Sequence, residues 1–350
     1  MELAVDLNRE QSVIDFYRYP PIGGEDWRYI WATAQVRVLE TLMLARSVLL
    51  NMADAPDFAS AVELLGGSEY AMTSGPPSPG AVEQILLERR SAVRGLFIDL
   101  MLDENLVELL RAREDFANMR LAVRRVVTGK PVGVDYSDAG SVPAEQFEEI
   151  FEHEDYERFP DYLQGAVEEA ILGYYQNKDI RRIDYGIDKM GWDYNLRSAG
   201  ECGSIFCESL FRTQIDLTNI RTMLRLKMAE RDERNLFIVG GFVETDRFVH
   251  GLGVGYEALA TLFYATPYHG VLDAGVSYLM SEQSFLHLEK GCQDCLMGFL
   301  KTTRVITAGP QPVIAFLMMK ENEIRTVRMV LTCKKNRMDT KFILDRLGEN

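Results

Sequence analysis

The segment DFANMRLAV at residues 115–123 recurs as DLTNIRTML at residues 216–224 and as EIRTVRMVL at residues 323–331. Each copy starts with an acid, has Asn or Thr three residues later, and has Arg five residues after the acid; these nine residues are Asp115, Asn118, Arg120, Asp216, Asn219, Arg221, Glu323, Thr326 and Arg328. Successive arginines are separated by 101 and then by 107 residues. This period is too long for the common helical solenoids, so it predicts units that each contain several helices.

Each copy has the apolar spacing of an amphipathic helix. In the first copy, Phe116, Met119 and Val123 follow the i, i+3, i+7 pattern and share one face. We expect each acid near the start of its helix, where a carboxylate can accept from free backbone N–H groups. Each Arg lies roughly 140° around the helix from its acid. The two are therefore predicted to contact neighbouring helices or units and not each other.

A second feature shares the first offset, because Gly140 and Gly241 are also 101 residues apart. Two independent features with one offset indicate a duplicated unit and not a chance match. We therefore predict an all-α protein with helical units at residues 1–110, 111–211 and 212–310. Residues 311–350 would supply a C-terminal helix, at about 311–333, that packs back on the first unit.

Periodicity elsewhere in the chain is also helical. It predicts one long helix over residues 27–51, a short helix over 57–65 that starts at Asp57, and a long helical region over about 81–110. Residues 145–157 are predicted to form an amphipathic helix with a solvated acidic face. Loops rich in Gly and Pro are expected at residues 66–80 and 128–144.

Composition limits the possible functions. The 350 residues carry a formal net charge of −15, which argues against a broad nucleic-acid surface, since neutralising phosphates requires clustered Lys and Arg. Five scattered cysteines indicate a reducing cytoplasm and not a disulfide framework. The N-terminus lacks a signal-peptide pattern, and no stretch approaches about 18 uninterrupted apolar residues, so we expect no membrane-spanning helix.

Several local patterns imitate functional sites. Cys292 and Cys295 have CxxC spacing, but no second Cys or His pair lies at a zinc-like distance. Residues 251–255 are rich in Gly without the context of a nucleotide fingerprint, and residues 128–131 do not fit a phosphate loop. We therefore predict no catalytic residue, no metal, no bound nucleotide and no cofactor.

Basic residues follow each copy of the repeated segment. They are either solvated helix faces or a surface that docks onto acidic loops of a partner protein. These ten residues are Arg124, Arg125, Lys130, Arg225, Lys227, Arg231, Arg234, Lys334, Lys335 and Arg337.

Parts of the sequence resemble the C subunit of prokaryotic A/V-type rotary ATPases, the counterpart of the d subunit of the vacuolar proton pump. The clearest likeness is in IDLTNIR at residues 215–221 and in PVIAFL at 312–317 followed by KENEIRTVR at 320–328. Residues 29–42 resemble the first helix of the family, and residues 61–70 resemble a short helix and turn found in each unit. The third copy departs from the pattern, with Thr326 in place of Asn.

The resemblance implies a funnel of three similar helical domains with pseudo-threefold symmetry. Such a subunit sits on the cytoplasmic face of the membrane-embedded proteolipid ring as one copy per complex, and its central hollow receives the central stalk. It turns with the rotor, couples ion flow to ATP synthesis or hydrolysis elsewhere, and catalyses nothing itself.

Two alternatives from other classes remain. A helical-repeat scaffold that binds proteins would form an open superhelix with a continuous groove. An enzyme with an unrecognised site would bring polar groups with perturbed pKa values together in a closed pocket.

Overall fold

The computed structural model describes residues 19–72, 75–129 and 136–348, and every regular element in these ranges is a helix. The chain divides into two compact units, one made of residues 1–102 and 254–350 and the other of residues 103–253. This confirms the predicted all-α class. The division into three units stays a prediction.

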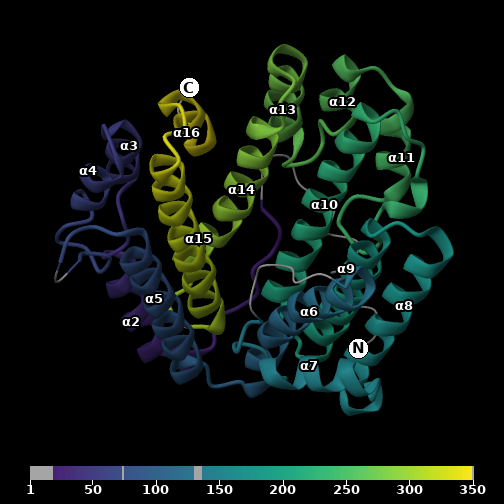
Figure 1. Cartoon of the computed structure of the whole chain (residues 1–350), viewed down its shortest axis with the longest axis horizontal. Helices are drawn as coiled ribbons and strands as arrows, with labels where there is room; N and C mark the ends of the chain where they lie inside the picture. Colours follow the sequence, from purple (N-terminus) through teal and green to yellow (C-terminus); the bar gives the residue numbers. More distant parts are fainter. Residues whose placement is uncertain (1–18, 73–74, 130–135, 349–350) are drawn as a thin grey trace. The chain divides into compact units, whose positions relative to one another are not determined.

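The first unit joins the two ends of the chain. Its N-terminal part contains η1 (Trp27–Tyr29), α2 (Ile30–Glu40), α3 (Arg46–Asp54), α4 (Phe58–Glu63) and α5 (Pro79–Leu100). Its C-terminal part contains α12 (Tyr256–Leu262), α13 (His269–Glu282), α14 (Leu286–Lys301), η4 (Thr302–Val305), α15 (Pro310–Lys335) and α16 (Thr340–Leu347). Helix α15 packs on α2, α3, α4 and α5, so segments far apart in sequence lie side by side (Figure 1).

The core of this unit forms around α15. Its Ile324, Val327 and Leu331 are buried, as the i, i+3, i+7 pattern predicts, and they pack with Met52 of α3 and Val62 of α4. Because each buried aliphatic side chain contributes about 1.5–3 kcal/mol, this stripe is a main reason that the two ends of the chain are held together.

The second unit contains α6 (Glu104–Thr128), α7 (Ala144–His153), η2 (Tyr156–Arg158), α8 (Asp161–Asn177), α9 (Arg181–Glu201), α10 (Ile205–Met228), η3 (Arg234–Leu236) and α11 (Thr245–Gly253). Helix α9 packs on α6, α8 and α10. Phe116, Met119 and Val123 of α6 lie in a core with Phe147 and Ile150 of α7. The amphipathic helix predicted over 145–157 is therefore confirmed for α7, whose apolar face is buried, but it ends at His153 and the separate 3₁₀ helix η2 follows.

Helix boundaries correct two sequence predictions. The single helix expected over residues 27–51 is broken between Glu40 and Arg46, and the region expected over 81–110 is broken between Leu100 and Glu104. Both breaks have tertiary causes, because the carboxylate of Glu323 accepts from the Leu44 N–H and the hydroxyl of Tyr29 accepts from the Leu102 N–H. The short helix α4 was predicted correctly and is capped by the Asp57 side chain, which accepts from the Ser60 N–H at 2.8 Å.

Candidate functional site

The repeated acids are buried and bind the loops that lead into short helices. Asp115 on α6 accepts from the backbone N–H groups of Ser141 and Val142 at 3.0 and 3.1 Å. Asp216 on α10 accepts from Phe242 and Val243 at the same two distances. These partners follow each acid by 26 and 27 residues, so the sequence repeat is also a repeat of hydrogen bonds.

Gly140 and Gly241 are explained by the same contact. A Cβ atom on either glycine would lie about 2 Å from a carboxylate oxygen, at 2.1 Å from Asp115 and 2.0 Å from Asp216. Only glycine lets the loop backbone approach the acid this closely. The shared offset of 101 residues therefore reflects one structural arrangement, a glycine packed against a buried carboxylate, which occurs twice in the second unit.

The repeated asparagines hold the same loops at a second point. The side chain of Asn118 donates to the carbonyl of Ser137 and accepts from its N–H, both at 2.8 Å. Asn219 does the same with Ile238, at 2.7 and 2.8 Å. Each amide thus satisfies both polar groups of one backbone residue, 19 positions further along the chain.

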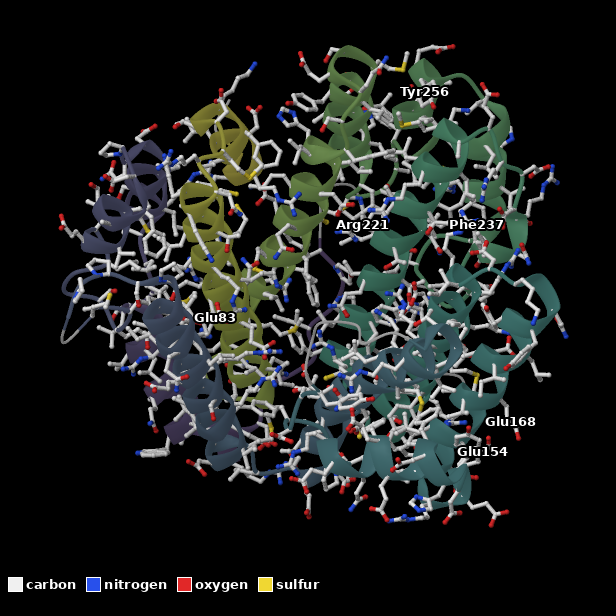
Figure 2. The ribbon with its side chains drawn as sticks, in the orientation of Figure 1. Glu83, Glu154, Glu168, Arg221, Phe237 and Tyr256 are labelled. Atoms are coloured by element: carbon white, nitrogen blue, oxygen red, sulfur yellow. The ribbon has the colours of Figure 1, made fainter. Side chains whose placement is uncertain are left out.

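Aromatic rings stack next to these loops in the same repeated way. Tyr136 stacks on Phe147 with a centroid distance of 5.7 Å, and Phe237 stacks on Phe248 at 5.8 Å. Phe237, which is labelled in Figure 2, therefore corresponds to Tyr136 at the same offset of 101 residues.

The third copy uses different partners. Glu323 on α15 accepts from the Leu44 N–H at 2.6 Å, from the Tyr70 hydroxyl at 2.7 Å and from Lys320 at 2.5 Å. Leu44 lies two residues before α3, just as Val142 and Val243 lie two residues before α7 and α11. All three buried acids therefore hold the residue at the same position before a short helix.

The predicted place of the acids near helix starts is wrong. Helix α6 begins at Glu104 and α10 begins at Ile205, so Asp115 and Asp216 lie about three turns inside their helices. Likewise α15 begins at Pro310, well before Glu323. The carboxylates satisfy N–H groups of other segments and do not cap their own helices.

Each repeated Arg was expected to reach another helix. Arg120 pairs with Asp188 of α9, and Arg328 pairs with Glu83 of α5 at 2.9 Å. Figure 2 labels Glu83 on α5 and Arg221, which is half-buried on α10. The two ion pairs lie inside one compact unit each, and a role of the nine motif residues between units stays a prediction. The third-copy Thr326 donates to the Asn322 carbonyl of its own helix.

Burial raises the pKa values of three side chains, one each on α6, α8 and α9. Desolvation raises the pKa of Asp115, against the lowering effect of the N–H groups of Val142 and Ser141. Burial also raises the pKa of Tyr162, whose hydroxyl donates to Asp115 at 2.9 Å. The pKa of Asp188 is raised by burial despite the opposing charge of Arg120.

Several residues of the predicted docking clusters are engaged within the chain. Arg124 pairs with Asp184, and Arg125 pairs with Glu148. The exposed Arg231 and Arg234 pair with Glu233 and Asp232, respectively, and these four residues are close neighbours in sequence. Arg225, Lys335 and Arg337 are exposed, while Lys130 lies outside the described residues.

Two lysines of these clusters bind the ends of short helices. Lys227 donates to the carbonyls of Gly251 and Leu252 at the end of α11, at 3.3 and 3.1 Å. Lys334 is buried and donates to the carbonyl of Ala55, directly after α3, at 2.7 Å. A cation at a helix C-terminus satisfies free carbonyls and opposes the helix dipole. Sequence reasoning missed this role, although Lys227 and Lys334 share the offset of 107 residues seen between Arg221 and Arg328.

The CxxC pattern lies within a single helix. Cys292 and Cys295 are buried thiols on α14. Among the described residues, no group of three His, Cys, Asp or Glu side chains is placed to hold a metal ion. A cavity of about 390 Å³ next to Cys295 is mostly apolar, with lining residues Tyr19, Pro267, Gly270, Val271, Ala274, Gly291, Asp294 and Cys295.

Within the part of the chain that the structure describes, no helix is both long enough and apolar enough to cross a membrane.

Comparison with known proteins decides the family. The model of the ATP synthase (C/AC39) subunit family matches residues 32–346. The chain belongs to the ATP synthase (C/AC39) subunit family. The C subunit of the V-type ATP synthase of Thermus thermophilus is 23% identical over 321 residues, which are 89% of this chain and 94% of that protein.

Other C/AC39 relatives come from different kinds of complex. The C subunit of the A-type ATP synthase of Methanococcoides burtonii is 23% identical, over 65% of this chain and 67% of that protein. The C subunit of the V-type sodium ATPase of Enterococcus hirae is 21% identical, over 71% of this chain and 76% of that protein. The resemblance noted in the repeated segments is therefore confirmed.

Proposed function

We propose that this chain is a non-catalytic rotor subunit that couples a membrane-embedded proteolipid ring to the central stalk of an A/V-type ATPase or ATP synthase. It would be present as one copy, on the cytoplasmic face of the membrane sector, and would transmit torque without binding nucleotide. The observation that carries the proposal is the family match over residues 32–346.

The hydrogen bonds that the repeated acids make to loop N–H groups support this role physically. Torque is transmitted only by a body that resists local bending. Each buried acid fixes a loop to a long helix, and each asparagine in the first two copies fixes it again 19 residues after the Asn. We propose that the three copies mark three similar helical units with pseudo-threefold symmetry, arranged as a funnel.

Co-elution tests the proposal. The purified chain is mixed with the central-stalk subunits of its own complex and, separately, with the detergent-solubilised proteolipid ring. We expect stoichiometric co-elution with both on size exclusion, with one copy per ring. Binding to neither, under conditions in which those partners assemble with their other neighbours, would refute the rotor role and favour a protein-binding scaffold.

The ion that the complex translocates is not fixed by the relatives, because the name of one includes sodium and the names of the others do not. Reconstituting the assembled complex in vesicles and measuring ATP-driven uptake of H⁺ or Na⁺ would identify the ion.

A further inference from the structure

Large apolar side chains are exposed to water on α2 and on the residues just before and after it. Trp27, Trp31, Val38 and Leu42 are 62%, 70%, 64% and 66% exposed, and Ile30 is 51% exposed. Within the helix itself, Ile30, Trp31 and Val38 fall within about 100° of arc. We call these five residues the α2 stripe.

The opposite face of the helix is buried and fixes its position. Tyr29, Ala32, Thr33 and Val36 are buried, and Thr33 exchanges hydrogen bonds with the backbone of Gly309. The α2 stripe therefore contributes little to the fold of its own unit. Two exposed tryptophans four residues apart, Trp27 in η1 and Trp31 in α2, are typical of a surface that binds a partner.

Charges beside the α2 stripe are compensated within the chain. Asp26 pairs with Arg28 at 2.6 Å, and Arg37 pairs with Glu40 at 2.8 Å. Arg37 also donates to the carbonyl of Thr303 at 2.6 Å, which places η4 beside α2. The apolar surface continues there, since Val305 of η4 is 78% exposed.

We propose that the α2 stripe is the surface by which this protein binds the membrane-embedded proteolipid ring, at the level where the ring meets the bilayer surface. The identity of the ring as partner rests on the proposed function. Tryptophan has an apolar body and one N–H donor, and it is enriched where protein passes from lipid to water. The α2 stripe is apolar and the charges beside it are paired, so it complements a partner surface at the boundary between lipid and water better than it complements a charged partner surface.

The charge of the chain disfavours two other occupants. A net charge of −15 opposes close association of two copies, and it opposes adsorption to an anionic lipid surface. A protein partner with an apolar, weakly charged contact face remains. Within the proposed complex, the membrane-embedded ring fits this description.

The test compares two matched double variants. The stripe variant is Trp31→Glu with Val38→Glu. The control is Leu87→Glu with Met280→Glu, which adds the same charge at exposed apolar positions on α5 and α13 of the same unit. Both variants should keep the wild-type circular dichroism spectrum, because all four side chains are exposed.

Binding is measured to the ring in nanodiscs of zwitterionic lipid, to empty nanodiscs, and to the central-stalk subunits. We expect the stripe variant to bind the ring at least about tenfold more weakly, with stalk binding unchanged and the control at wild-type affinity.

Wild-type affinity of the stripe variant for the ring would overturn the inference and leave the proposed function intact. So would loss of stalk binding alone, equal binding to empty nanodiscs, or a wild-type dimer that the stripe variant dissociates. A wild-type chain that binds neither ring nor stalk would refute the proposed function instead.

Discussion

Removing one repeated asparagine should open the loop that it holds, and the cost should depend on how much water can reach that loop. Asn219 is fully buried, and both of its bonds go to Ile238, which is also buried. Asn118 makes the same two bonds to Ser137, which is half-exposed. The two sites therefore allow the same pair of hydrogen bonds to be compared where water is excluded and where water has access.

The magnitude follows from the groups left without partners. Asn219→Ala leaves one buried N–H and one buried C=O, at about 1–3 kcal/mol each, so we expect about 2–6 kcal/mol in total. Asn118→Ala leaves the same two groups where water can replace the amide, so we expect about 1 kcal/mol. Asn235→Ala, at an exposed position, should change stability by less than about 0.5 kcal/mol.

Amide hydrogen exchange measures these costs locally. We expect the exchange of the Ile238 amide to accelerate by about 30-fold or more in Asn219→Ala, which corresponds to the lower end of the range. The Ser137 amide in Asn118→Ala should accelerate several-fold. Equal acceleration at the two sites, or an Asn219→Ala variant no different from Asn235→Ala, would refute the reasoning.

Further predictions concern single charged groups. Because burial raises the pKa of Asp115 in the folded chain, stability should fall as pH rises from the ordinary Asp value of 3.8 through the raised folded value; Asp115→Asn should flatten this slope in urea titrations at stepped pH. Lys334→Met should lower the thermal midpoint, at a cost of about 1–3 kcal/mol, because the Ala55 carbonyl loses a buried charged donor. A double-mutant cycle on Arg328 and Glu83, scored by urea unfolding, should give a coupling of only about 0.2–1 kcal/mol, since both side chains are partly exposed.

The helices themselves could be predicted because their apolar stripes are local in sequence. The faces of α6, α10 and α15 follow from residues at i, i+3 and i+7, and these positions are buried as expected. The start of α4 could be predicted from Asp57, whose side chain caps the next turn. In these cases the interactions that decide the structure lie within a few residues of one another.

The breaks between helices could not be predicted, because distant residues cause them. Leu44 is held by Glu323, which is 279 residues away, and Leu102 is held by Tyr29, which is 73 residues away. Neither segment carries a strong local stop signal such as Pro or Gly at the break. A periodic pattern shows which face of a helix is buried, but it does not show where the chain leaves the helix.

The role of the repeated acids was misjudged for a related reason. Asp115 is the first residue of its copy, and a carboxylate near the start of a helix can accept from free backbone N–H groups, so a position near the helix start was expected. The signal that could have identified the true role was the pairing of each acid with a glycine 25 residues later, at Gly140 and Gly241. Once the two are read together, the close approach of loop and carboxylate follows from the absence of a Cβ atom.

The differences in the third copy have one explanation. Asp115 and Asp216 each bind a loop that follows along the chain, whereas only α16 follows α15 in the described residues. Glu323 instead binds Leu44, whose preceding residues to Glu40 already satisfy much of their backbone hydrogen bonding within α2 and its final turn. A side chain that corresponds to Asn118 or Asn219 would therefore find few unsatisfied backbone groups in that segment. This accounts for Thr326 in place of Asn. The longer Glu side chain adds one methylene of reach. Lys320 supplies the donor that a second loop N–H supplies elsewhere, and the Tyr70 hydroxyl donates to Glu323 as that of Tyr162 does to Asp115. The third copy therefore keeps the function of the motif, which is to fix the start of a short helix, while the order of its parts along the chain is changed.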